Sequence, residues 1–402
     1  MHSFRYLIIG GGMAGDAAVR GIREVDPNGP IGLIGAELHP PYDRPPLTKG
    51  LWKGKPLESV WRGAAADEAT LRLGRWVETL DPARKLVRDD GGTFYHYEKL
   101  LLATGGTPRQ LADDAGIVLY YRTLDDYHTL RKMAADKQRF IVIGSGFIGS
   151  EIAAALAIND KQVVMVFPDE AIGGHRYPPD LGQFLNDFYR QKGVEVRAGE
   201  EVVRLEERNG RAVVHARSRR DGSEHEIVGD AVVAGIGIQP NVALGHQAGL
   251  EVGDGVRVDS ALCTSDPNIF AAGDVAEFFN PAMGQYIRVE HEDNANTMGE
   301  AAGRSMAGSP VHYDYLPYFY SDLFELGYEA IGQLDSRLQT VADWKEPLRE
   351  GVVYYLQDGR VRGVLLWNVW ERVDAARQLI AEPGPFQPAD LVGRPLETRV
   401  TA

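Results

Sequence analysis

The feature that most constrains the fold of this chain is a glycine-rich segment that occurs twice. The copies read YLIIGGGMAGDAAVRGI and FIVIGSGFIGSEIAAAL, and each sets its glycines in the spacing G-x-G-x-x-G. These glycines are Gly10, Gly12 and Gly15 in the first copy and Gly144, Gly146 and Gly149 in the second. Each copy joins a β-branched apolar run to a helix of small residues, so that a helix N-terminus can approach a pyrophosphate. One copy alone matches many glycine-rich turns, but two copies in this context predict two dinucleotide-binding domains.

Two apolar runs end in small residues after these segments. The first, EKLLLATGGTPR, ends at Ala103, Thr104 and Gly105. The second, DAVVAGIGIQPN, ends with Gly235 and Gly237. We expect each run to be the strand that closes a dinucleotide-binding domain and leads the chain out of it.

The rest of the chain completes the predicted fold. A third apolar run, NIFAAGDVAEF, ends at Asp274 and suggests a return to the first domain. Its aspartate either caps a helix or reaches a hydroxyl or phosphate of the bound nucleotide. Farther on, GVVYYLQDGRVRGVLLWNV predicts a hairpin around Asp358-Gly359, and a helix is expected over 372–381. The sequence therefore predicts an α/β fold with two Rossmann-like domains and a C-terminal α+β domain.

Composition excludes several classes of function. Lys and Arg total 43 against 57 Asp and Glu, and this net charge of -14 argues against a nucleic-acid partner. No apolar run approaches the roughly 20 residues of a membrane helix, and Met1 leads directly into an apolar strand, so we expect a cytoplasmic protein without a membrane span. Cys263 is the only cysteine, which excludes a redox-active cysteine pair and a cysteine-rich metal site within the chain. No metal is predicted.

Four segments together resemble the pyridine-nucleotide-dependent flavoprotein reductases: the first glycine segment, PPYDRPPLTKG, ATGGTPR, and the second glycine segment with the later AAGD. Further segments, VEHEDNA, FYSDLFELGYEAIGQLD and GVVYYLQDGRVRGVLLWN, resemble the apoptosis-inducing factor group and the ferredoxin, rubredoxin and putidaredoxin reductases. The resemblance implies a glutathione reductase-like arrangement. FAD is then expected on residues 1–111 and 243–310, NADH on 112–242, and a domain covering the flavin at 311–402.

The resemblance also implies roles for residues around the reacting groups. Arg44 and Lys49 match positions that contact FAD, with Lys49 near flavin N5. Glu151 matches a carboxylate that pairs with this lysine beside the nicotinamide. A cation near N5 would stabilise the anionic reduced flavin, and a buried lysine requires a partner such as Glu151. The alternative for Glu151 is a surface charge on a long helix.

Other matched positions lie in the second glycine segment and near the C-terminal domain. Phe147, followed by Ile148, matches an aromatic residue that shields the flavin until nicotinamide displaces it. Glu290 and His291 in VEHEDNA and Tyr320 in FYSDL match positions that bind or line the flavin. Lys49, Glu151, His291 and Tyr320 are therefore the predicted catalytic residues. His291 has the alternative of a core histidine.

Two acidic residues bear on ribose recognition. Dinucleotide sites often carry an acid about 20 residues after the glycines, but in the first domain the strand ends before Glu37, so the ribose contact either shifts to Glu37 or is lost. In the second domain Asp169 and Glu170 follow the strand over 163–166. Because a carboxylate repels a 2′-phosphate, Asp169 predicts a preference for NADH over NADPH, which the nearby His175 and Arg176 would soften.

Two functions remain open. The first is an FAD-dependent NADH oxidoreductase that passes electrons to a ferredoxin-like protein, a quinone or a dye, without a redox-active disulfide. The second is a redox-gated interaction protein resembling apoptosis-inducing factor, with a long-lived NADH–flavin charge-transfer complex and slow turnover. Glu292 stands where ferredoxin reductases tend to carry Trp, which favours the second. The expected partners are NADH and possibly a small electron-carrier protein, and the expected state is a monomer or homodimer.

Overall fold

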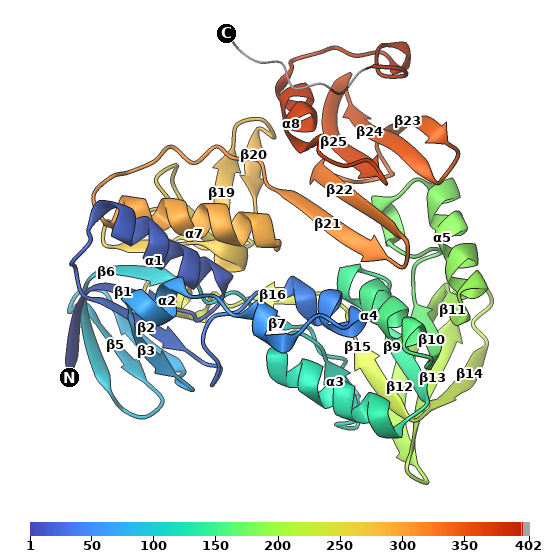
Figure 1. The fold of residues 1–402 in the computed structure, drawn as a ribbon, viewed down its shortest axis with the longest axis horizontal. Helices are drawn as coiled ribbons and strands as arrows, with labels where there is room; N and C mark the ends of the chain where they lie inside the picture. Colours follow the sequence, from blue (N-terminus) through green and yellow to red (C-terminus); the bar gives the residue numbers. More distant parts are fainter. Residues whose placement is uncertain (395, 397–402) are drawn as a thin grey trace. The chain divides into compact units, whose positions relative to one another are not determined.

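The computed structural model describes residues 1–394 and 396, and it divides into two compact units. Unit 1 comprises Met1–Arg44, Leu57–Thr107 and Gln239–Tyr318. Unit 2 comprises Pro45–Pro56, Pro108–Ile238 and the described residues from Phe319 on. The short strands β7 (Gly106–Pro108) and β16 (Ile238–Pro240) contain two of the points at which the chain changes unit. Figure 1 follows the chain through both units.

Unit 1 is built on a seven-stranded sheet in the order β3-β2-β1-β6-β5-β4, with β18 pairing to β6. The strands are β1 (His2–Ile9), β2 (Ile31–Gly35), β3 (Thr70–Leu73), β4 (Val77–Asp81), β5 (Leu86–Asp89), β6 (Phe94–Leu102) and β18 (Ile269–Ala271). The pairs among β1, β2, β3, β6 and β18 are parallel, and β4 and β5 extend the sheet with antiparallel pairs. Because β18 pairs with β6, the chain returns to the first sheet, as the sequence predicts.

The helices of unit 1 pack closely on this sheet. They are α1 (Met13–Val25), α2 (Ala64–Glu68), α6 (Ala243–Gln247) and α7 (Glu292–Met306). A smaller sheet contains β17 (Val256–Val258), β19 (Ala276–Asn280) and β20 (Gln285–Ile287). α1 and α7 lie side by side (Figure 1). A Cβ atom on Gly303 would lie 2.2 Å from the carbonyl oxygen of Ala18, so only glycine permits this approach.

The first part of unit 2 is a parallel sheet in the order β11-β10-β9-β15-β8. Its strands are β8 (Val118–Tyr120), β9 (Arg139–Ile143), β10 (Gln162–Phe167), β11 (Val194–Ala198) and β15 (Ala231–Ala234), and its helices are α3 (Leu124–Asp136), α4 (Phe147–Ile158) and α5 (Pro179–Gln191). A three-stranded antiparallel sheet of β12 (Glu200–Arg208), β13 (Arg211–Ser218) and β14 (Glu224–Gly229) packs its apolar side chains against β9 and β10. Strands and helices thus alternate around the second glycine segment, and the α/β prediction is confirmed.

The second part of unit 2 is a five-stranded sheet in the order β21-β22-β25-β24-β23. Its strands are β21 (Tyr318–Leu323), β22 (Leu326–Gly332), β23 (Gln339–Glu346), β24 (Glu350–Gln357) and β25 (Arg360–Trp367), and α8 (Val373–Ala381) packs on it. Asp358 and Gly359 both have positive φ, 52° and 73°, and join β24 to β25. The predicted hairpin and the following helix are therefore confirmed. The three-domain boundaries of the sequence analysis stay a prediction.

The segment Pro45–Pro56 clusters with unit 2, although the predicted FAD domain includes it. It contains the short 3₁₀ helices η1 (Pro45–Leu47) and η2 (Gly50–Lys53). The hydroxyl of Tyr121 donates to the carbonyl oxygen of Leu47 at 2.6 Å, and Asn159 Nδ2 donates to that of Trp52 at 3.1 Å. These bonds, made to residues distant in sequence, fix the segment against α4 and the end of β8. No helix in the described part of the chain is long and apolar enough to span a membrane.

Candidate active site

The first glycine segment forms a backbone cradle in unit 1. Gly10 has a φ of +127°, and a Cβ atom there would lie 2.0 Å from the carbonyl oxygen of Ala103. Gly12 is the N-cap of α1, whose first turn has no side-chain cap. A Cβ atom on Gly12 would meet no protein atom within 4 Å, so the space beside these N–H groups is open. Open space at an uncapped helix N-terminus fits a pyrophosphate.

The second glycine segment repeats this cradle in unit 2. Gly144 has a φ of +106°, and a Cβ atom there would lie 2.4 Å from the carbonyl oxygen of Gly235. Gly146 is the N-cap of α4, again without a side-chain cap. The nearest atom to a Cβ on Gly146 is Nη2 of Arg176, at 3.5 Å. The two cradles therefore differ in one respect: a guanidinium lies beside the second.

The remaining small residues lock the two cradles. A Cβ atom on Gly15 would lie 2.2 Å from the carbonyl oxygen of Gly10, and the corresponding distance from Gly149 to Gly144 is also 2.2 Å. Thr104 Oγ1 donates to the carbonyl oxygen of Asn241 at 2.9 Å. Three other residues were predicted in these turns. Gly105 and Ile148 are half-buried, and Gly237 is exposed.

Glu37 of unit 1 already has partners for both carboxylate oxygens. Arg44 Nη2 lies 2.6 Å from Oε1, and the hydroxyl of Tyr42 donates to Oε2 at 2.6 Å. Arg44 also lies over the Tyr42 ring, 5.2 Å from its centroid. Burial acts to lower the pKa of Arg44, but Tyr42 and Glu37 outweigh it and raise the pKa. The structure thus brings Glu37 and Arg44 together, and a ribose contact by Glu37 stays a prediction.

Asp274 and Glu290 of unit 1 contact Arg288, and His291 follows Glu290 in the chain. Asp274 is in the 3₁₀ helix η5 (Gly273–Val275), and Arg288 Nη1 donates to its carbonyl oxygen at 3.1 Å. The same nitrogen donates to Glu290 Oε1 at 2.6 Å. His291 is half-buried and is the N-cap of α7. Sequence reasoning missed Arg288, although its place two residues before Glu290 in the VEHEDNA segment is a usable signal.

Lys49 and Glu151 form the most buried ion pair among the predicted site residues. Lys49 Nζ lies 2.8 Å from Glu151 Oε1, and the side chains are 13% and 2% exposed. Glu151 also accepts hydrogen bonds from Thr48 Oγ1 at 2.5 Å and from Ser321 Oγ at 2.6 Å. The surface alternative for Glu151 is therefore wrong, because α4 buries this residue in its second turn. Thr48 and Ser321 were missed, although both lie inside segments that carry the family resemblance.

Aromatic residues adjoin this pair. Lys49 Nζ lies 5.2 Å from the ring centroid of Tyr320, on β21. The ring of Phe147, at the start of α4, packs edge-on against Phe319, with centroids 5.5 Å apart and planes at 85°. Lys49, Glu151, Phe147 and Tyr320 thus belong to one region of unit 2. Their catalytic roles stay predictions.

Asp169 lies just beyond the end of β10, at the same edge of the sheet as the second cradle. Its carboxylate is 3.0 Å from the position of a Cβ on Gly174, and its carbonyl oxygen accepts from the N–H of Gly199 at 2.8 Å. The neighbouring Glu170 is exposed. Two carboxylates therefore follow β10, where a parallel-sheet domain binds the adenine ribose.

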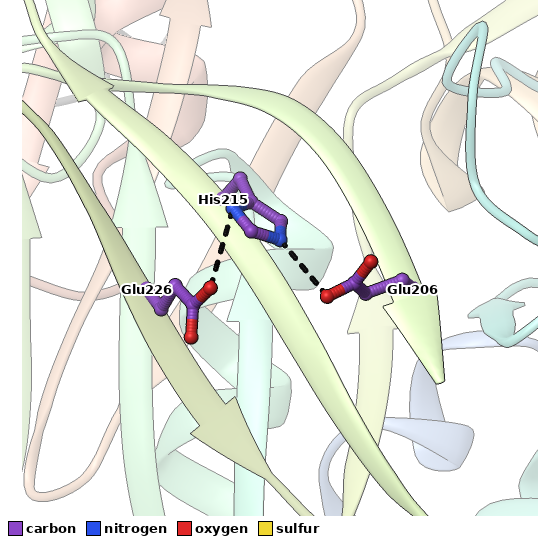
Figure 2. A group of neighbouring side chains, drawn as sticks. All are labelled: Glu206, His215 and Glu226. Carbon is purple, nitrogen blue, oxygen red and sulfur yellow. Dashed lines mark ion pairs between the residues drawn. The ribbon is translucent and has the colours of Figure 1, made fainter. Parts of the chain in front are cut away.

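A further group in unit 2 has the spacing of metal ligands. Glu206, His215 and Glu226 project toward one another from β12, β13 and β14 (Figure 2), with ligand atoms within 4.8 Å. Arg204 Nη1 lies 2.9 Å from Glu206 Oε2, and Arg208 pairs with both carboxylates. Hydrogen bonds from Arg204 and then Arg208 lower the pKa of Glu206 to about 2. The arginines balance the carboxylates, so we describe the group as a cross-strand ion network.

Comparison with known proteins places these features in context. The family model described as "Pyridine nucleotide-disulphide oxidoreductase" matches residues 4–299, and one described as "Apoptosis-inducing factor, mitochondrion-associated, C-term" matches residues 343–382. The chain is 34% identical to apoptosis-inducing factor 1, mitochondrial, of Dictyostelium discoideum, over 94% of this chain and 79% of that protein. It is 33% identical to the anthranilate 1,2-dioxygenase system ferredoxin–NAD(+) reductase component of Burkholderia cepacia, over 96% and 97% of the two chains. Its fold is similar to that of a chain in the crystal structure of the covalent putidaredoxin reductase–putidaredoxin complex, with a TM-score of 0.87 and 29% identity over 97% of this chain and 95% of that chain.

Proposed function

The chain belongs to the pyridine nucleotide-disulphide oxidoreductase family, and from that premise we propose that it oxidises NADH and passes electrons through FAD to a separate acceptor. FAD and NAD(H) are its cofactors. When bound, the nicotinamide supplies a hydride and the flavin accepts it. Cys263 is the only cysteine, so this chain has no cysteine pair that could relay the electrons.

The residues of the two cradles fit the phosphates of these cofactors. In unit 1, the N-terminus of α1 would hold the FAD pyrophosphate beside Gly12, where the structure leaves open space. In unit 2, the N-terminus of α4 would hold the pyrophosphate of NADH beside Gly146. In both places, uncapped N–H groups and the helix dipole favour an anion.

The buried Lys49–Glu151 pair is the observation that carries the proposed chemistry. With FAD bound, Lys49 would supply a positive charge that favours negative charge on the flavin. Glu151 holds the lysine in place, and Thr48 and Ser321 fix the carboxylate through its two oxygens. A buried ion pair with additional donors on the carboxylate is suited to such a role because the geometry is set before the substrate arrives.

We propose NADH rather than NADPH as the electron donor. Asp169 and Glu170 after β10 offer carboxylates to the ribose hydroxyls, and they would repel a 2′-phosphate. We propose a small iron–sulphur electron carrier as the acceptor, because similar proteins include a ferredoxin–NAD(+) reductase component and putidaredoxin reductase. A quinone or dye is the alternative acceptor.

Anaerobic stopped-flow reduction of the flavin tests this proposal. We expect NADH to bleach the flavin absorbance much faster than NADPH at equal, low concentration. Lys49→Ala should lose FAD or slow this reduction, whereas the nearby and more exposed Lys53→Ala should not. Parental FAD content and parental reduction rate in Lys49→Ala would exclude the assigned role.

A second candidate function follows from the similarity to apoptosis-inducing factor. In this function NADH reduces the flavin to a long-lived complex that alters an interaction, with slow turnover. Glu292 is the observation that favours it, because this carboxylate is the first residue of α7, where ferredoxin reductases tend to carry Trp. Steady-state turnover with a panel of ferredoxins, quinones and dyes separates the two functions, since only the first requires a fast acceptor.

A further inference from the structure

A cation and an aromatic ring hold Phe147 at the start of α4. Arg176 Cζ lies 4.3 Å from the centroid of the Phe147 ring. The ring of Phe319 contacts Phe147 edge-on at 5.5 Å. Arg176 ends the 3₁₀ helix η4 (Gly174–Arg176), and the hydroxyl of Tyr355 donates to its carbonyl oxygen at 2.6 Å. The backbone of Arg176 is thereby fixed while its side chain lies on Phe147.

The same guanidinium lies beside the N-terminus of α4. Its Nη2 atom is 3.5 Å from the position of a Cβ on Gly146, the N-cap residue. A helix N-terminus carries partial positive charge, so a cation there is unfavourable unless an anion joins it. The guanidinium makes one long hydrogen bond, 3.4 Å to the carbonyl oxygen of Gly173, and no ion pair within the described part of the chain. Two sources of positive charge thus lie together, and no carboxylate among the described residues forms an ion pair with the guanidinium.

The first cradle lacks this arrangement. There, a Cβ on Gly12 would meet no atom within 4 Å, so no cation occupies the position that Arg176 holds beside Gly146. A guanidinium therefore lies beside the N-cap glycine of the second cradle and not beside that of the first.

We propose that Arg176 transfers from the Phe147 ring to the pyrophosphate of the incoming dinucleotide, which removes a contact that helps to hold Phe147. Arg176 is then a binding residue for the pyrophosphate and a positioning residue for Phe147. A charge-assisted hydrogen bond to phosphate is typically stronger than the cation–π contact of a half-buried arginine, which favours the transfer. The inference rests on the proposed function, because it requires the dinucleotide to bind at α4.

The transfer orders two events. The phosphates reach Arg176 at Gly146, and Phe147 is the next residue along the chain. Binding of the phosphate portion therefore loosens Phe147 before the nicotinamide displaces the ring of Phe147. A ligand with the pyrophosphate but no nicotinamide should bind the state in which Arg176 has left Phe147.

ADP-ribose is that ligand, and calorimetric titration of the oxidised, FAD-loaded protein is the assay. We expect Arg176→Ala to weaken ADP-ribose binding about 10-fold, the typical effect of a lost hydrogen bond to a charged group. Phe147→Ala should tighten it about 2- to 5-fold, because the cation–π contact no longer has to be broken. Arg217→Ala is the matched control, since this exposed arginine on β13 pairs with Glu224 and its loss changes the net charge equally.

Two further measurements separate charge from structural support. Arg176→Lys should keep most of the affinity that Arg176→Ala loses, and the loss in Arg176→Ala should shrink at high salt. A lysine variant as weak as the alanine variant would overturn the inference. Equal affinities of Arg176→Ala and Arg217→Ala for ADP-ribose would also overturn it. The same holds if Phe147→Ala binds ADP-ribose no more tightly than the parent. If the parent itself binds no ADP-ribose, the proposed function fails, and the inference fails with it.

Discussion

Loss of one charge from the buried Lys49–Glu151 pair should have a large effect, and Glu151→Gln is the sharpest form of that change. The substitution keeps the side-chain shape and one acceptor oxygen. It replaces the other oxygen with an NH₂ group, which must face Lys49, Thr48 or Ser321, all of which donate to the carboxylate in the parent. Lys49, only 13% exposed, then has no counter-charge at 2.8 Å.

The magnitude follows from burial. Removing one partner of a buried pair typically costs about 3 to 5 kcal/mol, because the remaining charge is left without compensation. The neighbouring pair of Lys53 and Asp322 provides the comparison: its atoms are 3.9 Å apart, and its side chains are 45% and 40% exposed. Exposed pairs of this kind contribute about 0 to 1 kcal/mol. Asp322→Asn is therefore a matched control that removes the same charge one residue after Ser321.

The assay combines urea unfolding with anaerobic flavin reduction by NADH. We expect Glu151→Gln to lower the free energy of unfolding by about 3 kcal/mol, near the lower limit because the amide keeps one acceptor. Flavin reduction should also slow, since Lys49 is no longer held. Asp322→Asn should change neither quantity appreciably. Equal unfolding free energies in Glu151→Gln and Asp322→Asn would refute the reasoning from burial, and an unchanged reduction rate would refute the catalytic role.

Three other predictions concern the donor, the reduced state and acid stability. Asp169→Ala should narrow the gap between NADH and NADPH in the rate of flavin reduction, because it removes a carboxylate that repels the 2′-phosphate. An unchanged ratio of the two rates in stopped flow would refute the role of Asp169 in donor choice. Anaerobic titration with NADH should produce a broad long-wavelength charge-transfer band that decays slowly in air, because we expect Phe147 and Tyr320 to clamp the nicotinamide. Prompt bleaching without the band would favour the fast reductase. The pKa of Glu206 is lowered from 4.5 to about 2, so the stabilisation from its ion network is complete above pH 4.5 and is lost as the pH falls toward 2. Glu206→Gln should remove that part of the pH dependence in urea unfolding, and a profile identical to the parent would contradict the assignment.

The sequence predicted what local rules determine. The glycine spacing identified both cradles because the need for each glycine arises from the local geometry of one strand-to-helix turn. The Asp358-Gly359 hairpin was predictable because both residues adopt positive φ, which this dipeptide tolerates. The end of β18 at Ala271, just before Gly273 and Asp274, was predictable because an apolar run followed by Gly-Asp marks the end of a buried strand.

Contacts between distant segments were not predictable in the same way. Thr48 and Ser321 contact Glu151 across 103 and 170 residues of sequence, and no local pattern reports such a distance. The contact of Arg176 with Phe147 depends on where η4 places a flexible side chain. The clustering of Pro45–Pro56 with unit 2 depends on hydrogen bonds from Tyr121 and Asn159, which lie far along the chain.

Strand β21 has a consequence for how this chain can change during evolution. Three consecutive residues, Phe319, Tyr320 and Ser321, contact Phe147, Lys49 and Glu151 respectively. A tight two-residue turn at Phe324 and Glu325 joins β21 to β22, and Phe324 has a φ of 62°. A single insertion or deletion in this hairpin would shift β21 by one residue against β22. All three contacts would then move together, since a one-residue shift reverses the faces of a strand. We therefore expect length variation among related chains to fall outside this hairpin, and new acceptor preferences to arise by substitution on exposed surfaces.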